Sequence, residues 1–334
     1  MKKIINSTDT LITEMINGIT KAFPDTFKRI DDEKRAVVYT KSPIKEKVGI
    51  ATGGGSGHLP LFLGYIGENM IDGAAIGEVF SSPSVSEMYA VTKAISSGKG
   101  VLYLYGNYSG DIMNFDMAAE MAADDGIPVE TCIGADDVAS APKEEKENRR
   151  GIAGILFGYK IAGAKAAKGA SLKEVKATTD AALENVRTMG VALSPCTIPA
   201  AGVPTFEIGE DEMEIGMGIH GEKGIERGKL KTANEITDYL MERIIEDLPY
   251  RKDDEVAVLV NGLGATAPQE LYIVFNRVEE ILSKKGIKIY RNYVGEFATS
   301  MEMKGLSVSL FKLTDEFKEL LDMPVKTPML LQQF

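Results

Sequence analysis

The sequence contains only two histidines, two cysteines and no tryptophan among its 334 residues. Cys132 and Cys196 lie far apart and do not form a Cys-x-x-Cys pair, so we predict buried structural thiols rather than a redox site. Neither histidine has a second histidine or cysteine at the spacing of metal ligands, which argues against a zinc centre. The sequence therefore predicts no metal site.

Positive charge is also scarce, because 38 Lys and Arg stand against 49 Asp and Glu and give a net charge of −11. Nucleic acids and anionic membranes are bound by basic faces, so we expect neither as a partner. The N-terminal residues 1–6 are followed by Ser7 and Asp9 and form no apolar signal sequence, which predicts a cytoplasmic protein. Lysines interrupt the glycine- and alanine-rich stretch 151–170 before it reaches a membrane-spanning length.

The order of apolar and polar segments predicts two domains of an α/β protein. In the first half, short apolar runs such as Val101–Tyr105 alternate with helical patterns, which is typical of a doubly wound, mostly parallel sheet covered by helices on both faces. A stretch with three prolines, 193–204, begins a region without this regular alternation. We predict an αβα domain over residues 1–190 and a smaller α+β domain over residues 191–334.

Several element boundaries can be predicted from local patterns. Residues 48–51 are predicted to form a strand that a glycine loop follows directly, and a helix is expected to begin at Leu61. The capping-box pattern that begins at Ser171 predicts a long helix ending near residue 190, and a second capping box at Thr232 opens another helix. Pro268 is suited to the first turn of a further helix.

Both histidines occur in glycine-rich segments, Thr52–His58 and Gly216–Gly221. Glycine lets the backbone approach a small ligand closely, and histidine supplies a nucleophile or proton carrier near neutral pH. Each histidine could instead be an ordinary turn or core residue. Ligands of doubly wound sheets bind at the carboxyl ends of strands, so we expect His58 to lie close to Asp111, which follows the strand 101–105. Asp111 could also end an Asx-turn.

The glycine segment does not have the pattern of a nucleotide site. No Gly-Lys-Ser/Thr follows Gly53–His58, and the segment does not match the dinucleotide-binding pattern Gly-x-Gly-x-x-Gly with an acidic residue at the required distance. No cluster of spaced aspartates is present to hold Mg²⁺ beside a triphosphate. We therefore expect this chain to bind no nucleotide or metal cofactor.

Four segments together resemble the substrate-binding K subunit of dihydroxyacetone kinases: Thr52–His58, Asn107–Phe115, Met189–Thr197 and Gly216–Gly221. The resemblance covers nearly the whole chain, and the motifs follow the order of that family. It implies that an imidazole nitrogen of His220 adds to the ketone carbon of a short-chain ketose and forms a covalent hemiaminal. The residues that it implies for substrate contact are Gly55, Ser56, Gly57, His58, Gly106, Asp111 and His220.

The resemblance also implies the roles of the catalytic groups and the partners. Asp111 would accept the proton of the terminal hydroxyl as this attacks phosphorus, and His58 would position that hydroxyl. ATP or ADP and Mg²⁺ would belong to a nucleotide-binding L-type subunit, with ATP or a phosphotransferase-system protein as the phosphoryl donor. We expect the chain to form a homodimer.

Two positions depart from the family's usual pattern. The glycine loop continues with Leu59 where the family has Glu, and Gly106 stands where Lys is usual. The loss of two polar side chains leaves more room, so erythrulose is an alternative substrate to dihydroxyacetone. A second alternative is a ketose-sensing paralogue that co-activates a transcription regulator. The presence of Asp111 and His58 favours catalysis, because a sensor needs no general base.

Overall fold

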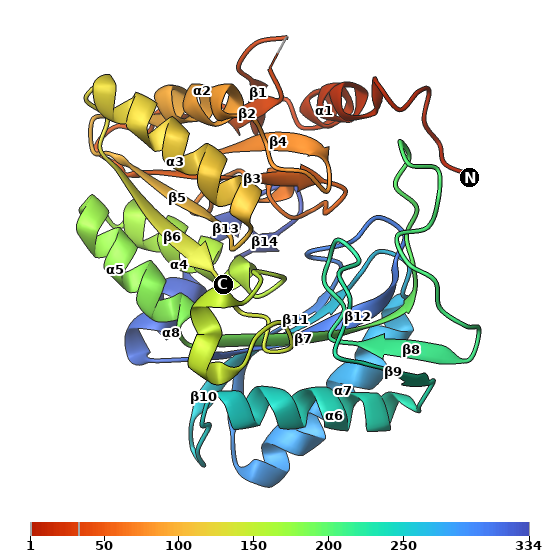
Figure 1. Ribbon diagram of the computed structural model, residues 1–334. Coiled ribbons are helices and arrows are strands. Elements are labelled where there is room, and N and C mark those ends of the chain that lie inside the picture. Colours follow the sequence, from red (N-terminus) through yellow and green to blue (C-terminus); the bar gives the residue numbers. More distant parts are fainter. Residues whose placement is uncertain (1, 33, 334) are drawn as a thin grey trace. The chain divides into compact units, whose positions relative to one another are not determined.

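The computed structural model describes residues 2–32 and 34–333 (Figure 1). The chain forms two compact units that alternate along the sequence. The first unit comprises Lys2–Ile133, Gly158–Ala181 and the residues from Glu319 onward, and the second comprises Gly134–Phe157 and Ala182–Lys318. The units therefore do not coincide with the contiguous segments 1–190 and 191–334, because the strand that begins at Val186 pairs within the sheet of the second unit.

The first unit is built on a six-stranded sheet. Its strands lie in the order β1 (Phe27–Arg29), β2 (Ala36–Tyr39), β4 (Gly73–Val79), β3 (Gly49–Ser56), β5 (Val101–Gly106) and β6 (Val129–Gly134). The pairs β3–β4 and β3–β5 are parallel, whereas β1–β2 and β2–β4 are antiparallel. The α/β prediction is confirmed, and the predicted parallel pairing holds at the centre of this sheet.

Helices cover the sheet of the first unit on both faces. Met88 and Phe115, from α2 and α3, pack against strand residues such as Tyr103 on one face. Successive side chains of a strand point to opposite faces, so Thr52 of β3 points to the other face. There its Oγ1 lies 2.9 Å from the hydroxyl of Tyr159, which belongs to α4. The helices and short elements with residues in this unit are α1 (Leu11–Ala22), η1 (Leu63–Tyr65), α2 (Val85–Ile95), α3 (Ser109–Asp124), α4 (Ile155–Ala167), α5 (Leu172–Leu183), α8 (Asp315–Asp322), β13 (Val325–Lys326) and β14 (Leu331–Gln332).

Three predicted boundaries in this part of the chain are wrong. The strand β3 runs on to Ser56, so the glycines 53–55 lie in a strand and not in a loop. The helix expected from Leu61 is a single 3₁₀ turn, η1, whose three residues are all buried and offer no polar face. The helix that starts at Leu172 ends at Leu183, because the residues that follow pair as a strand with a distant segment.

The second unit has a mixed six-stranded sheet with two helices on one face (Figure 1). Its strands lie in the order β11 (Lys288–Gly295), β10 (Glu255–Gly262), β12 (Lys304–Lys312), β7 (Val186–Ser194), β8 (Glu212–Ile215) and β9 (Glu226–Lys229), and its helices are η2 (Lys143–Asn148), α6 (Ala233–Asp247) and α7 (Pro268–Lys285). Only β10–β11 is parallel among the pairs described. The predicted capping box at Thr232 and the predicted start of a helix at Pro268 are confirmed.

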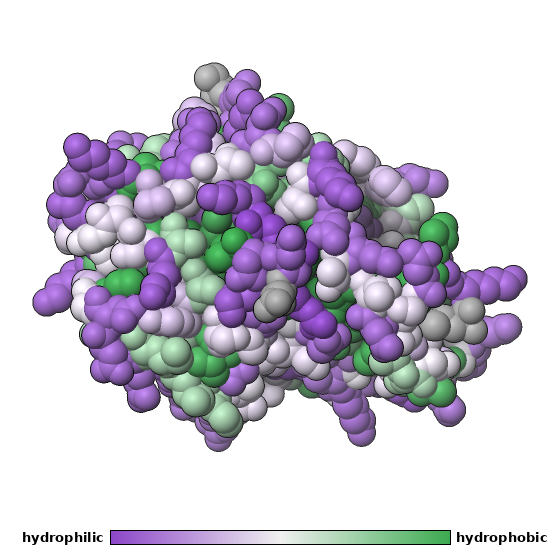
Figure 2. Space-filling view, turned by 90° about the horizontal axis from the view of Figure 1, so that it is seen from above, coloured by the Kyte–Doolittle hydropathy of each residue, from purple (hydrophilic) through white to green (hydrophobic). Residues whose placement is uncertain are grey.

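Polar side chains cover most of the face seen in Figure 2, and apolar side chains appear there only in small patches. Cys132 and Cys196 are both buried, as predicted, and both are free thiols. Among residues 2–32 and 34–333, no helix is long and apolar enough to cross a membrane.

Candidate functional site

The predicted site residues of the first unit gather at one edge of its sheet. Ser56, Val79 and Gly106 end the neighbouring strands β3, β4 and β5. These strands are parallel, so the segments that follow them emerge at the same edge. Those segments carry His58 and Asp111, so both residues follow strand ends at the same edge of the sheet.

His58 is almost completely buried in an aromatic setting, with 1% of its surface exposed. Its ring stacks on Phe80 with the centroids 4.8 Å apart and meets the edge of Phe62 at 6.3 Å. Gly57 precedes it with a φ of 100°, a conformation that favours glycine and turns the chain out of β3. The Phe80 N–H also donates to the Ser56 carbonyl at 3.1 Å, which fixes the stacking ring beside the end of the strand.

Asp111 lies in the first turn of α3, where the helix dipole favours a negative charge. Asp111 is only 7% exposed, so its carboxyl group is buried within the first unit. Burial raises the pKa of Tyr105 far above its usual value, and the charges of Asp116 and Asp111 raise it further. Burial is also the main reason that the pKa of Tyr159 is raised, and Asp111 adds to it. The Asp111 charge therefore acts on tyrosines of both β5 and α4.

The glycines of β3 allow other segments to approach its backbone. A Cβ on Gly55 would lie 2.6 Å from the Ser81 backbone nitrogen and 2.7 Å from the Phe80 Cα. A Cβ on Gly54 would lie 2.2 Å from the ring of Phe62. The glycines thus allow the segment after β4 to lie directly against β3. This segment includes Phe80, whose ring stacks on His58.

Two hydroxyl groups at this edge are buried without a hydrogen-bond partner among the described residues. They are Ser56 Oγ, at the end of β3, and the Tyr105 hydroxyl, next to the final residue of β5. Gly106, which ends β5, is buried and contributes only backbone. Buried polar groups usually have partners, so these hydroxyls are suited to bind a polar ligand.

His220 belongs to the second unit, in the turn between β8 and β9. Met217 and Ile219 anchor this turn with 4% and 5% exposure, and the Ser300 hydroxyl donates to the Ile219 carbonyl at 2.5 Å. The His220 side chain itself is 22% exposed. Gly216, with a φ of 77°, and Gly221, with a φ of 85°, take backbone conformations that favour glycine, so the glycine-rich sequence serves the turn.

A series of charged side chains behind His220 was not predicted from the sequence. Glu222 Oε1 lies 2.8 Å from His220 Nδ1, and Arg150 Nη1 lies 4.0 Å from the same carboxyl group. Arg150 donates to Asp137 at 2.9 Å and to the Gly216 carbonyl at 2.9 Å. A carboxylate two residues after a candidate nucleophilic histidine is the sequence signal that could have identified Glu222.

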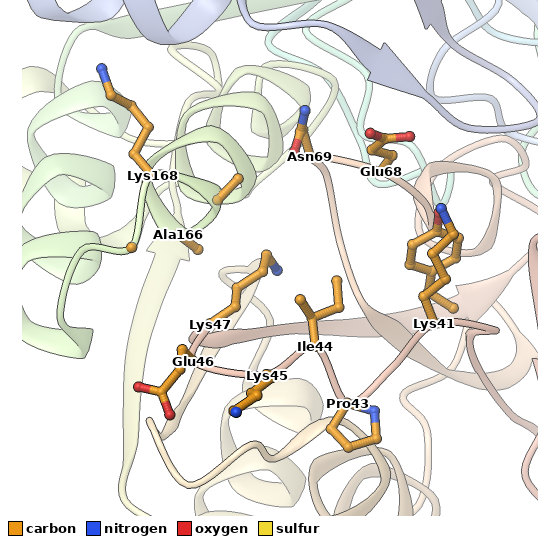
Figure 3. A pocket seen from close by; sticks show the side chains of 13 residues that line it. Lys41, Pro43, Ile44, Lys45, Glu46, Lys47, Glu68, Asn69, Ala166 and Lys168 are labelled. Atoms are coloured by element: carbon orange, nitrogen blue, oxygen red, sulfur yellow. The ribbon is translucent and has the colours of Figure 1, made fainter.

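A separate hollow of about 630 Å³ in the first unit contains none of the predicted site residues (Figure 3). Lys41, Lys45, Lys47 and Lys168 contribute to its wall. Lys47 pairs with Asp72 at 2.5 Å, and Lys168 pairs with Glu319. With Glu46 and Glu68 of the same wall, these carboxylates balance the lysines, so the hollow has no excess of positive charge.

The arrangement is that of an α/β protein with buried polar groups at the carboxyl ends of parallel strands, which are suited to a small polar ligand. Within the described part of the chain, no three His, Cys, Asp or Glu side chains are grouped as metal ligands. The chain belongs to the Dak1 domain family, whose profile matches residues 17–329.

Two curated relatives match nearly the whole chain. The dihydroxyacetone-binding subunit of PTS-dependent dihydroxyacetone kinase 2 from Listeria innocua is 47% identical over 328 residues, which are 98% of each chain. L-erythrulose 1-kinase from Mycolicibacterium smegmatis is 39% identical, and the match covers 98% of this chain and 58% of that protein.

Two solved structures have the same fold. The dihydroxyacetone kinase of C. freundii in complex with AMP-PNP and Mg²⁺ is 30% identical with a TM-score of 0.91, and the match covers 99% of this chain and 61% of that chain. A dihydroxyacetone kinase operon co-activator is 29% identical with a TM-score of 0.90, and the match covers 96% of this chain and 99% of that one.

Proposed function

We propose that this chain is the ketose-binding subunit of a dihydroxyacetone kinase and that a partner subunit phosphorylates the terminal hydroxyl of the bound ketose. The observation that carries the proposal is the convergence of His58, Ser56 and Asp111, each no more than 7% exposed, on one edge of the sheet. The match with the Listeria innocua subunit over 98% of both chains supports it.

His220 is the group that selects a ketose. An imidazole nitrogen adds to the electrophilic ketone carbon and forms a covalent hemiaminal. Polyols such as glycerol lack such a carbon and cannot be held in this way. Anchored by its glycine-rich turn and 22% exposed, the imidazole is ordered and still accessible to a small molecule.

Asp111 acts as the general base of the transfer. It accepts the proton of the terminal hydroxyl as this oxygen attacks phosphorus, and His58 positions the hydroxyl. The backbone of Gly55, Gly57 and Gly106 and the hydroxyl of Ser56 supply hydrogen bonds to the substrate. The Ser56 hydroxyl is buried and has no hydrogen-bond partner among the described residues, so it is suited to this role.

The phosphoryl donor belongs to the partner. A nucleotide-binding L-type subunit carries ATP or ADP and Mg²⁺, in keeping with the AMP-PNP and Mg²⁺ complex of the C. freundii kinase, which is longer than this chain. Either ATP or a phosphotransferase-system protein supplies the phosphoryl group, and the name of the Listeria innocua relative supports the second. The active protein is a cytoplasmic homodimer in complex with this subunit.

A second candidate function is ligand sensing. The similarity of the fold to a kinase operon co-activator, with a TM-score of 0.90 over 96% of this chain, favours it. A sensor would bind the ketose through His220 and contact a transcription regulator. It would transfer no phosphate.

Phosphate transfer separates the two candidates. The purified chain is mixed with the nucleotide-binding subunit, Mg²⁺ and either dihydroxyacetone or erythrulose. One reaction receives ATP, and a second receives ADP, phosphoenolpyruvate and the phosphotransferase proteins. We expect a ketose phosphate in at least one reaction, formed at least about 100-fold more slowly by the Asp111→Ala variant. If no ketose phosphate forms from either substrate with either donor, the kinase proposal is wrong and sensing remains.

A further inference from the structure

Glu222 contacts His220 through both of its carboxylate oxygens. Its Oε1 lies 2.8 Å from the imidazole Nδ1, and its Oε2 accepts the His220 backbone N–H at 2.9 Å. The two carboxylate oxygens therefore bind the ring and the backbone of one residue. This double contact fixes where the carboxylate lies relative to the imidazole plane.

The first contact determines which ring nitrogen carries the proton. Burial opposes the charge of Glu222, but the hydrogen bond and charge of His220 outweigh it and lower the pKa of the carboxyl to about 2. At neutral pH Glu222 is thus ionised and can only accept hydrogen bonds. Nδ1 must then be the donor, and in the neutral ring the lone pair resides on Nε2.

The surroundings keep Glu222 in place. Arg150 Nη1 lies 4.0 Å from Oε2, and Arg150 is itself held by Asp137 and by the Gly216 carbonyl. A Cβ on Gly218 would lie 2.0 Å from Glu222 Oε2, so only glycine leaves room for the carboxylate at this position. The glycine-rich turn thus serves the carboxylate as well as the backbone.

The geometry points to Glu222 as a positioning residue that holds His220 in the Nδ1-protonated tautomer and so makes Nε2 the nucleophile. This inference rests on the proposed hemiaminal of His220. It adds the residue that holds the ring in the reactive tautomer.

The addition of His220 to the ketone balances in protons and electrons when Glu222 accepts the hydrogen bond from Nδ1. The Nε2 lone pair forms the bond to the ketone carbon, and the carbonyl π electrons move to oxygen, which takes up a proton and becomes a hydroxyl. The ring carries a positive charge while Nδ1 keeps its proton, and the Glu222 carboxylate stabilises that charge. Loss of the Nδ1 proton toward Glu222 and solvent restores the neutral ring, so one proton is gained and one is lost.

Replacement of Glu222 by glutamine should reverse the tautomer. The His220 backbone N–H needs an acceptor, so the glutamine carbonyl oxygen takes the place of Oε2. The amide NH₂ then faces Nδ1 as a donor, and Nδ1 must accept. The proton moves to Nε2, which removes the nucleophilic lone pair while the size of the side chain barely changes.

Nitrogen-15 NMR of the imidazoles reads the tautomer without ligand. Because the chain has only two histidines, a His58→Asn variant leaves the His220 ring as the single imidazole to assign. We expect His220 in the wild type to be protonated at Nδ1 and in Glu222→Gln to be protonated at Nε2. Glu242 is an exposed residue of α6, so Glu242→Gln should not change the protonation of the His220 ring. A His220 protonated at Nε2 in the wild type, or unchanged in Glu222→Gln, overturns the inference.

Adduct formation with dihydroxyacetone labelled at C2 with carbon-13 tests the consequence. Glu222→Gln should form the tetrahedral adduct at least about 100-fold more slowly than the wild type and Glu242→Gln, the loss expected when a histidine cannot use its reactive nitrogen. Undiminished adduct formation in Glu222→Gln overturns the inference. If the wild type forms no adduct, or His220→Ala still forms one, the proposed function fails instead. The ligand-free tautomer measurement separates these two failures. The His58 signals, compared in chains that keep this residue, report whether each variant is folded.

Discussion

Arg149 donates two hydrogen bonds to the carboxylate of Asp247, at 2.9 and 2.6 Å, and the two side chains are only 1% and 9% exposed. Arg187 binds the same carboxylate. Burial disfavours the charge of Asp247, but the hydrogen bonds from the two arginines outweigh it and lower the pKa of the carboxyl. This cluster joins η2 and β7 to the end of α6 within the second unit.

The first prediction concerns the stability of this unit. Arg149→Met should lower the free energy of unfolding by about 3–5 kcal/mol, because it leaves part of a buried ion cluster without its partner. Arg243→Met removes an exposed arginine from α6 and should cost less than about 1 kcal/mol. Urea unfolding followed by circular dichroism measures both values. Equal losses in the two variants would show that burial does not strengthen the Arg149–Asp247 pair.

The second prediction concerns the packing against β3. Gly55→Ala should destabilise the first unit by about 1–3 kcal/mol, because the added methyl group would meet the backbone of Phe80 and Ser81. The same change at Gly18 is the matched control. Gly18 lies inside α1 with nothing within 4 Å of an added Cβ, so Gly18→Ala should stabilise by about 0.5–1 kcal/mol. Thermal unfolding of the two variants gives the signs, and a stabilised Gly55→Ala would refute the close-packing argument.

The third prediction separates binding from transfer. His220→Ala should abolish the ketose adduct, whereas Asp111→Ala should retain it and lose about 10²–10⁴-fold in kcat, the usual contribution of a general base. Intact-mass measurement after reduction of trapped ligand, together with the coupled kinase assay, reads the two effects. An unchanged adduct in the His220 variant would reject its covalent role, and full turnover in the Asp111 variant would reject its role as base.

The fourth prediction concerns substrate size. Gly106 ends β5 and is buried, so this position brings no long cation to the edge that holds Asp111. Erythrulose should compete with dihydroxyacetone within about tenfold in kcat/KM, a gap of about 1.4 kcal/mol, and Gly106→Lys should shift the preference toward the triose. The similarity to an erythrulose kinase supports the choice of competitor.

Competition kinetics with the reconstituted complex check the substrate preference. A thousandfold preference of the wild type for dihydroxyacetone would show that Gly106 does not widen the pocket. An unchanged ratio in the Gly106→Lys variant would show that this position does not determine substrate size. Val203→Lys, in an exposed part of the second unit, controls for the added charge.

The sequence by itself determined the family, the α/β class and the candidate residues. The motifs around His58, Asp111 and His220 are contiguous segments, so they are readable without coordinates. Local signals also identified helix starts such as Thr232 and Pro268, because capping depends on residues within one turn of each other.

The tertiary structure decided which glycines lie in strand β3, where the helix α5 ends and how the two units share the chain. Each depends on pairing between residues far apart in sequence, such as β7 with β12, which no local pattern contains. The structure also selected Glu222 from the many acidic residues. Gly218 leaves space for the Glu222 carboxylate, which lies against the His220 ring and near the positive charge of Arg150, and Asp137 holds Arg150 in place. These contacts exist only after folding.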